Sequence, residues 1–573
     1  MSLRTMMRLK VLTPFAALSL LAACATLPPS AEPPAALAGN VSAADPRAEE
    51  AGLAMLRAGG SATDAAIATM IALTVVEPQS SGIGGGGFLV RGAADGSVTT
   101  FDGREKAPAG AGHDWFLEDG QVPPFEVSVK SGLSVGVPGN IALAAKAHAK
   151  YGRLAWAKLF EPAIALARNG FAMNPRLVQS LSQTPDRAGW TATGRALFFG
   201  ADGQPLPAGT IVRNEELAQT FEAIAKAGPG AFYRGPRAEA LAATVAAATP
   251  RPRPMNAADL AAYEAKERPA VCSLYRGYRL CGMGPPTSGG IAVLQILGML
   301  ERFDLKQLGA RNPVTWHLFL EAQRLAYADR ELYLADSDFV AVPVAGLVDP
   351  DYVASRSRLI DPAQTIADPQ AGVPFGAPIA LADGDEPEEH GTSDFAAVDG
   401  SGTMVSYTST IESAFGSGLM TGGFYLNNEL TDFSRAPTVG GRLVANRVEG
   451  GKRPRSSMAP MVIWDPAGRP VIAVGAAGGS TIPVSTARAI VGMIDFGMSA
   501  EEALALPFTM AFGDTVLLEK GTWLESAMPQ FRALGHAKFR TGEAPIKVNA
   551  LRRTRNGWEA GREPRMEDLI DPP

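Results

Sequence analysis

The sequence predicts a layered fold of the α/β or α+β class, in which helices cover β-sheets. Three observations support this prediction. Capped or Ala-rich helical segments recur through the first 335 residues, a hairpin pattern begins at residue 392, and a strand followed by a helix occupies residues 470–497. Because 46% of the 573 residues are hydrophobic, the chain can bury a large core, in one large domain or several smaller ones.

The N-terminus indicates export. Arg4, Arg8 and Lys10 precede an apolar run that ends at Cys24. The run is too short to span a membrane and is typical of a secretory signal peptide over residues 1–24. Its last residues, Leu-Ala-Ala-Cys, resemble a bacterial lipobox, which implies lipidation of Cys24; an ordinary signal cut near a cysteine is the alternative. The Pro/Ala-rich residues 25–40 then predict a tether. We expect a periplasm-facing protein of the bacterial cell envelope, held to the membrane only by this lipid.

Two helices are expected next. Asp45 is a candidate N-cap with Pro46 at the first helical position, and this helix closes at residues 59–60. A second, mostly apolar helix begins after Ser61 and is ended by Pro78, so it should be buried. Further helices are expected within residues 135–170, 214–247 and 313–335.

Three glycines between the second helix and a strand satisfy the G-x-G-x-x-G pattern: Gly82, Gly84 and Gly87. A dinucleotide site needs a strand before the glycines and a helix after them, and here the order is reversed. The pattern therefore favours close backbone packing over nucleotide binding.

Cys272 and Cys281 flank a predicted hairpin centred on Arg276 and Gly277. In an oxidising compartment a disulfide between them is expected, with two free thiols as the alternative. These cysteines and five scattered histidines predict no metal site. The net charge of −6 and one short basic run at residues 452–455 predict no nucleic-acid partner.

Residues 361–391 are rich in Pro, Gly and Asp, and a hairpin then begins abruptly at Thr392. Further strands are expected at residues 422–428, 460–465 and 470–479, with a helix at 484–497. A threonine hydroxyl is a weak nucleophile unless a base lies beside it, and its own α-amine is such a base once the bond after Gly391 is cut. The alternative is an ordinary edge-strand threonine.

Eight stretches resemble the gamma-glutamyltransferase family of N-terminal-nucleophile hydrolases. They are "AGLAMLRAGGSATDAAIA", "SSGIGGGGF", "FDGREKAP", "PPTSGGI", "GTSDFAAVDGSGTMVSYTSTIESAFGSG", "LNNELTDFS", "KRPRSSMAP" and "GAAGGS". The resemblance spans about residues 41–550. It implies an α+β fold, a four-layer αββα sandwich made as a precursor. Self-cleavage between Gly391 and Thr392 would give a large subunit (41–391) and a small subunit (392–573) that together form one composite domain.

The resemblance also implies a role for each matching residue. Thr392 is the nucleophile, Thr410 hydrogen-bonds it, and the backbone N–H groups of Gly478 and Gly479 face the oxyanion. Two sets bind the α-amino acid head group: Arg104, Ser456 and Ser457 for the carboxylate, and Glu412, Glu429 and Asp432 for the ammonium.

Five features depart from the family pattern, one of them the tail at residues 562–573. Asp394 stands where many members have histidine, and Glu412 replaces a familiar asparagine. The lid segment 435–451 is short and has no tyrosine, and Ala476 and Ala477 precede the glycine pair where proline is common.

The resemblance implies a gamma-glutamyltransferase or glutathione hydrolase that needs no cofactor. Gamma-glutamyl compounds such as glutathione would acylate Thr392, and water or an amino-acid or peptide acceptor would take the acyl group. The alternatives are a cephalosporin (glutaryl amide) acylase on the same fold, which three acids in the ammonium pocket disfavour, and a non-catalytic envelope lipoprotein.

Overall fold

The computed structural model describes residues 38–378, 382 and 391–570. The predicted signal peptide, Cys24 and most of the tether lie outside the described residues, as do residues 379–381 and 383–390. No helix in the described part of the chain is long and apolar enough to cross a membrane.

Two six-stranded antiparallel sheets form the centre of the fold. The first has the strand order β1 (Asn40–Ala43), β9 (Ser393–Val398), β10 (Met404–Thr410), β2 (Gly86–Gly92), β3 (Val98–Asp102) and β6 (Lys266–Arg268). The second has the order β21 (Trp558–Arg562), β20 (Lys547–Arg553), β16 (Pro470–Ala477), β15 (Met461–Trp464), β8 (Tyr278–Gly282) and β7 (Val271–Tyr275). Each sheet therefore combines strands from both sides of Gly391.

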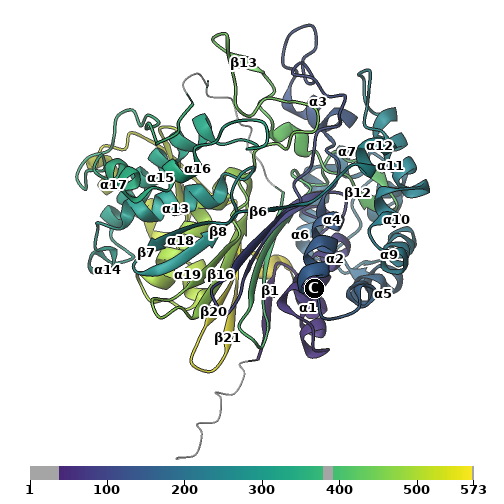
Figure 1. Ribbon diagram of the computed structural model, residues 1–573, viewed down its shortest axis with the longest axis horizontal. Helices are drawn as coiled ribbons and strands as arrows, with labels where there is room; N and C mark the ends of the chain where they lie inside the picture. The colour runs from purple at the N-terminus through teal and green to yellow at the C-terminus, as the bar shows by residue number, and fades with distance from the viewer. Residues whose placement is uncertain (1–37, 379–381, 383–390, 571–573) are drawn as a thin grey trace, which may run out of the picture. The chain divides into compact units, whose positions relative to one another are not determined.

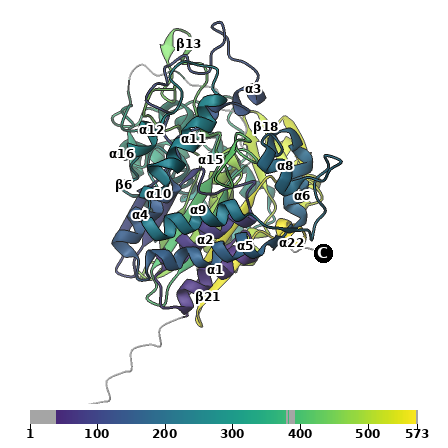
Figure 2. The ribbon, with the colours of Figure 1, turned by 90° about the vertical axis from the view of Figure 1, so that its right-hand side faces the viewer.

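Helices cover the outer face of each sheet, which confirms the four-layer αββα sandwich (Figure 1). The first sheet packs against α1 (Pro46–Arg57), α2 (Ala62–Val76) and α4 (Asn140–Tyr151), with α5 (Glu161–Asn169) and α9 (Glu215–Ala227) outside them. Figure 2 looks onto this helical layer. The second sheet packs against α13 (Gly289–Leu300), α18 (Ile482–Ile494) and α19 (Ala500–Leu504), and α15 (Pro313–Tyr333) packs on α13.

The other elements lie around this sandwich. The longer helices among them are α6 (Pro175–Gln183), α8 (Ala192–Phe198), α11 (Pro236–Ala247) and α17 (Pro350–Ser357). A small sheet contains β17 (Thr509–Phe512), β18 (Thr515–Glu519) and β19 (Lys538–Gly542). The lid segment carries the hairpin of β13 (Thr438–Val439) and β14 (Arg442–Leu443), whose four residues are exposed.

Local sequence signals explain the elements that hold the site. The Asp45 side chain caps α1, and Ser61 and Asp64 form a capping box that starts the fully buried α2. A side chain at Gly84 or Gly85 would place its Cβ within 2.0 or 1.9 Å of the Tyr425 or Thr410 carbonyl oxygen, respectively. Close backbone packing, and not a dinucleotide, thus accounts for the glycine segment.

One predicted strand is wrong in length. Residues 422–428 contain only β12 (Phe424–Tyr425). Gly422 and Gly423 have φ angles of 59° and 81°, outside the β region, and the Asn428 side chain bonds to loop residues instead of a ladder.

Candidate active site

Thr392 lies immediately before β9 and is buried, with 5% of its surface exposed. Its φ angle of 117° lies in a region that a β-branched residue rarely adopts. Its N–H donates to the Ser80 carbonyl at 3.0 Å, and its own carbonyl accepts from the Lys547 ammonium. The backbone is therefore held in a strained conformation at the bond that the sequence predicts to be cut.

Gly391 fits its position because it has no side chain. A Cβ at this residue would lie 1.5 Å from the carbonyl oxygen of Glu412. No larger residue can precede Thr392 without moving the segment that carries Glu412.

The Thr392 hydroxyl donates to Thr410 Oγ1 at 3.0 Å, as the family resemblance implies. Thr410 ends β10, and its Oγ1 also accepts from the Glu412 backbone N–H at 2.7 Å. The second contact fixes the Thr410 hydroxyl, so Thr410 can orient the hydroxyl of Thr392.

Gly478 and Gly479 form the turn from β16 to α18, with φ angles of 133° and 59°. Ala477, just before them, pairs in register with Lys547, whose ammonium reaches the Thr392 carbonyl. The turn therefore begins one residue beyond the ladder position that contacts Thr392. Backbone N–H groups at such a turn can stabilise a developing oxyanion.

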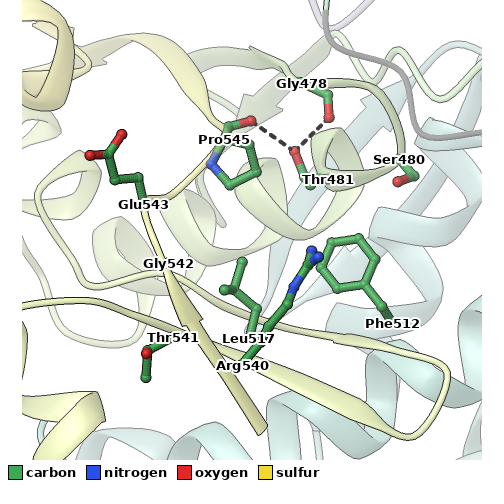
Figure 3. Close-up of a pocket in the computed structure, with 10 residues that line it drawn as sticks. All are labelled: Gly478, Ser480, Thr481, Phe512, Leu517, Arg540, Thr541, Gly542, Glu543 and Pro545. Carbon is green, nitrogen blue, oxygen red and sulfur yellow. Dashed lines mark hydrogen bonds between the residues drawn. The ribbon is translucent and has the colours of Figure 1, made fainter.

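A pocket of about 320 Å³ opens beside this turn (Figure 3). Gly478, Thr481 and Pro545 line one part of it, and the Thr481 hydroxyl bonds the Gly478 carbonyl at 2.8 Å. Arg540 of β19 lies over the ring of Phe512, 4.2 Å from its centroid. The pocket thus offers a cation and an apolar wall next to the candidate oxyanion site.

Arg104 follows β3 and is fully buried. Its guanidinium donates to the carboxylates of Glu429 and Asp432, and to the Arg455 carbonyl at 2.8 Å. The structure therefore brings together the residues predicted for the head group, but it pairs the arginine with the acids themselves. A zwitterionic ligand can exchange these pairs, because its carboxylate suits Arg104 and its ammonium suits the acids.

The carboxyl groups of this region exceed what Arg104 alone can pair. Burial, and then the nearby Asp432, raise the pKa of Glu412 well above its ordinary value; burial likewise raises that of Glu429. Within the described part of the chain, Glu412 Oε1 and Glu429 Oε2 are buried without a hydrogen-bond partner. Such atoms are costly to leave unpaired, and a bound ammonium would satisfy them.

The two serines border this region from the segment before β15. Ser457 Oγ accepts from Arg330 at 2.7 Å, and Ser456 Oγ accepts from the Met458 N–H at 3.1 Å. Both serines are buried.

This geometry agrees with the comparison to known proteins. The family model for gamma-glutamyltranspeptidase matches residues 48–570. The chain belongs to the gamma-glutamyltranspeptidase family.

Some of the similar proteins are named glutathione hydrolases and others are named acylases. A glutathione hydrolase proenzyme from Bacillus subtilis (strain 168) is 38% identical over 522 residues, covering 89% of this chain and 86% of that protein. The Acylase ACY 1 proenzyme from Pseudomonas sp. (strain V22) is 34% identical, covering 90% and 89%. A crystal structure of cephalosporin acylase from Bacillus halodurans has a TM-score of 0.81 at 27% identity, covering 94% of this chain and 98% of that one.

Sequence analysis missed two groups in this gamma-glutamyltranspeptidase site. Glu105, next to Arg104, is buried, and burial raises its pKa to about 8. Glu77, Arg176 and Lys547 form a buried charged cluster beside Thr392. Glu105 lies inside the quoted "FDGREKAP" stretch, where its charge was the only signal; Lys547 lies 155 positions from Thr392 and gave none.

The structure also shows the surroundings of Asp394 and Glu412, two residues that depart from the family pattern. Asp394 points toward Gly475 of the second sheet and accepts from the Thr408 hydroxyl at 2.6 Å. Burial raises its pKa well above the ordinary value. Glu412 has a φ of 73° and accepts from Asn428.

One cluster has the residue types of a metal site. Ligand atoms of His317, Glu321 and His536 lie within 4.8 Å of one another. The two histidine rings bond each other at 2.9 Å, and Glu321 accepts from Arg324, Thr365 and the Ile366 N–H. These atoms therefore already have protein partners, including a cation that disfavours a metal ion.

The two cysteines of the β7–β8 hairpin are joined. Cys272 and Cys281 pair in register and form a disulfide. The turn between the strands has positive φ at both Arg276 and Gly277, as a two-residue hairpin requires.

Proposed function

We propose that this protein is a gamma-glutamyl transferase and glutathione hydrolase that uses Thr392 as its nucleophile. Cleavage after Gly391 frees the α-amine of Thr392, which then accepts the proton of its own hydroxyl. Thr392 Oγ1 attacks the gamma-glutamyl carbonyl, and the amine of the substrate leaves. Water or an amino-acid acceptor resolves the ester. The observation that carries this proposal is the hydrogen bond between Thr392 and Thr410 at a strained backbone that follows Gly391.

The head-group contacts support a gamma-glutamyl donor. Arg104 would bind the α-carboxylate with help from Ser456 and Ser457, and the acids Glu412, Glu429 and Asp432 would bind the α-ammonium. Gly478 and Gly479 would hold the oxyanion. The pocket beside Gly478 would receive the leaving group or the acceptor, with Arg540 for a peptide carboxylate.

The test is the intact mass of the wild type beside Thr392→Ala. We expect two chains from the wild type, the smaller beginning at Thr392, and one uncut chain from the variant. Thr69→Ala removes another buried threonine, whose hydroxyl bonds the Ala65 carbonyl, and should cut normally. A wild type that stays whole while folded would favour the non-catalytic envelope protein.

The acylase-named relatives favour glutaryl amide hydrolysis as a second candidate. A glutaryl group has no α-amine, so it leaves the buried acids Glu412 and Glu429 unpaired. We therefore expect kcat/KM to be at least about 10²-fold higher for a gamma-glutamyl anilide than for the glutaryl anilide. The reverse preference would make the acylase the correct assignment.

We also propose export and lipid anchoring at Cys24 on the bacterial envelope, facing the periplasm. The support is the sequence pattern of residues 4–24. Cys24→Ser should release the protein from the membrane fraction. A variant that stays in that fraction and differs in mass from wild type only by the substitution, with no lipid lost, would contradict the anchor.

A further inference from the structure

Lys547 is the first residue of β20 and reaches across to Thr392. Its ammonium donates to the Thr392 carbonyl and lies 3.2 Å from the Ser80 hydroxyl. The Ser80 carbonyl in turn accepts from the Thr392 N–H at 3.0 Å. Ser80 and Lys547 thus hold both polar groups of the Thr392 backbone.

The charges around Lys547 are unbalanced. Among the described residues the carboxylate that acts on Lys547 is Glu77, which is already bound by Arg176 and accepts from the Ser393 hydroxyl at 2.5 Å. Burial favours a neutral Glu77, but the charges of Arg176 and Lys547, the Ser393 hydrogen bond and the charge of Arg47 outweigh it and lower its pKa. Two cations therefore face one acid in a buried site.

This imbalance affects the proton on Lys547. Burial, and then the charge of Arg176, lower its pKa to about 7, although Glu77 opposes the shift. An unpaired buried cation gives up its proton more easily than one in water.

Cleavage adds a second amino group at the same place. The backbone nitrogen of Thr392 becomes an α-amine, whose ordinary pKa is about 7.7–8.0. The two nitrogens lie on either side of one residue, so their titrations are coupled and they do not both hold a proton near neutral pH. Thr392 is itself buried beside Arg176 and Lys547, so the pKa of its α-amine falls below this ordinary value. Lys547 keeps the shared proton because two oxygen atoms accept from it and Glu77 faces it.

We propose that Lys547 is a positioning residue that holds the Thr392 backbone for attack and, as an ammonium, keeps the freed α-amine in its basic form. The inference rests on the function proposed above. In the reaction the α-amine takes the proton of Thr392 Oγ1 as the Oγ1–carbon bond forms. The same proton passes to the substrate nitrogen as its bond to the carbonyl carbon breaks. Lys547 does not exchange a proton with the substrate.

The test is the pH profile of kcat/KM for a gamma-glutamyl anilide, whose acid limb reports the base of the free enzyme. Removing the cation in Lys547→Met should move the acid limb up by about one pH unit or more. Activity should then fall about tenfold at pH 7 and recover near pH 9. Lys547→Arg keeps the charge and should retain the wild-type limb.

Lys452→Met is the matched control. Lys452 is also buried and also donates to backbone carbonyls, those of Ala445 and Arg447, but it has no contact with Thr392. Its acid limb should not move. If Lys547→Met is folded and self-cleaved but its kcat/KM profile has the same acid limb as wild type, the proposal is overturned.

Two further results keep the test decisive. If Lys547→Met folds but stays uncut while Lys547→Arg is cut, the positioning role is supported. If neither variant folds, the wild type decides: its acid limb should lie below about pH 7.7, and a midpoint at or above 8 overturns the proposal. A wild type that neither cuts nor hydrolyses the anilide refutes the proposed function instead, before any lysine variant is compared.

Discussion

Two buried charged clusters belong to this site, one at the predicted head-group residues and one beside the Thr392 backbone. The head-group cluster sets the carboxyl groups of Glu105, Glu429 and Asp432 around Arg104. Glu412 adds a fourth carboxyl group beside Asp432 and Glu429. The amine-side cluster sets the cations Arg176 and Lys547 around Glu77. The first cluster contains more carboxyl groups than cations, and the second contains more cations than carboxyl groups.

The difference indicates what each cluster does. Burying unbalanced charge is costly, so neither arrangement is explained by stability. An acid surplus suits a site that receives the ammonium of a substrate. A cation surplus suits a site that must keep a second amine neutral. The three predictions below test this contrast, from the largest expected effect to the smallest.

Arg104→Lys should have the largest effect. Lysine keeps the charge but loses the planar pair of donors that now reach Glu429 and Asp432. We expect kcat/KM for a gamma-glutamyl anilide to fall about 10²-fold, measured by steady-state kinetics on cut enzyme. Arg276→Lys, a change at the distant β7–β8 hairpin, serves as the control and should stay within about twofold. A fall of less than about threefold for Arg104→Lys would remove this arginine from the head-group site.

Glu412→Gln should separate binding from stability. Burial, and then the charge of Asp432, raise the pKa of Glu412, so its ionised form is disfavoured until an ammonium binds beside it. The amide cannot ionise, so KM should rise about tenfold with little change in kcat. Because a raised acid pKa costs stability as pH increases, the variant should also have a Tm about 1–3 °C above wild type at pH 8.

Glu559→Gln is the control for both KM and Tm, because Glu559 lies on β21 and pairs with Arg552. An unchanged KM in Glu412→Gln would mean that the acid surplus has another purpose than ammonium binding.

Much of this contrast between the two clusters could not be predicted from the sequence, because the residues that meet in each cluster lie far apart along the chain. Capping residues such as Asp45 and Ser61 act within three positions, so the sequence predicts α1 and α2 well. The family resemblance gathered Arg104, Glu429 and Asp432, but not their mutual ion pairs. Lys547 meets Thr392 only because β20 lies beside β16 in the second sheet. The strand at 422–428 failed because positive φ angles at its two glycines overrode its apolar content.

Asp394→Asn should have the smallest effect, on stability alone. Asp394 lies between the two sheets, and its Oδ2 has no hydrogen-bond partner among the described residues. Its folded pKa is raised by burial, so the stability of the protonated form is complete below the unfolded pKa of about 3.9 and is lost as pH rises through the folded value. Asparagine stays neutral and can still accept from the Thr408 hydroxyl. The Tm of the variant relative to wild type should therefore increase by about 1–3 °C between pH 5 and pH 8, measured by calorimetry. Asp202→Asn, at an exposed turn, should show no such trend. A constant Tm difference would mean that burial does not raise the pKa of Asp394 in the folded protein, and that the space between the sheets tolerates a carboxylate as well as an amide.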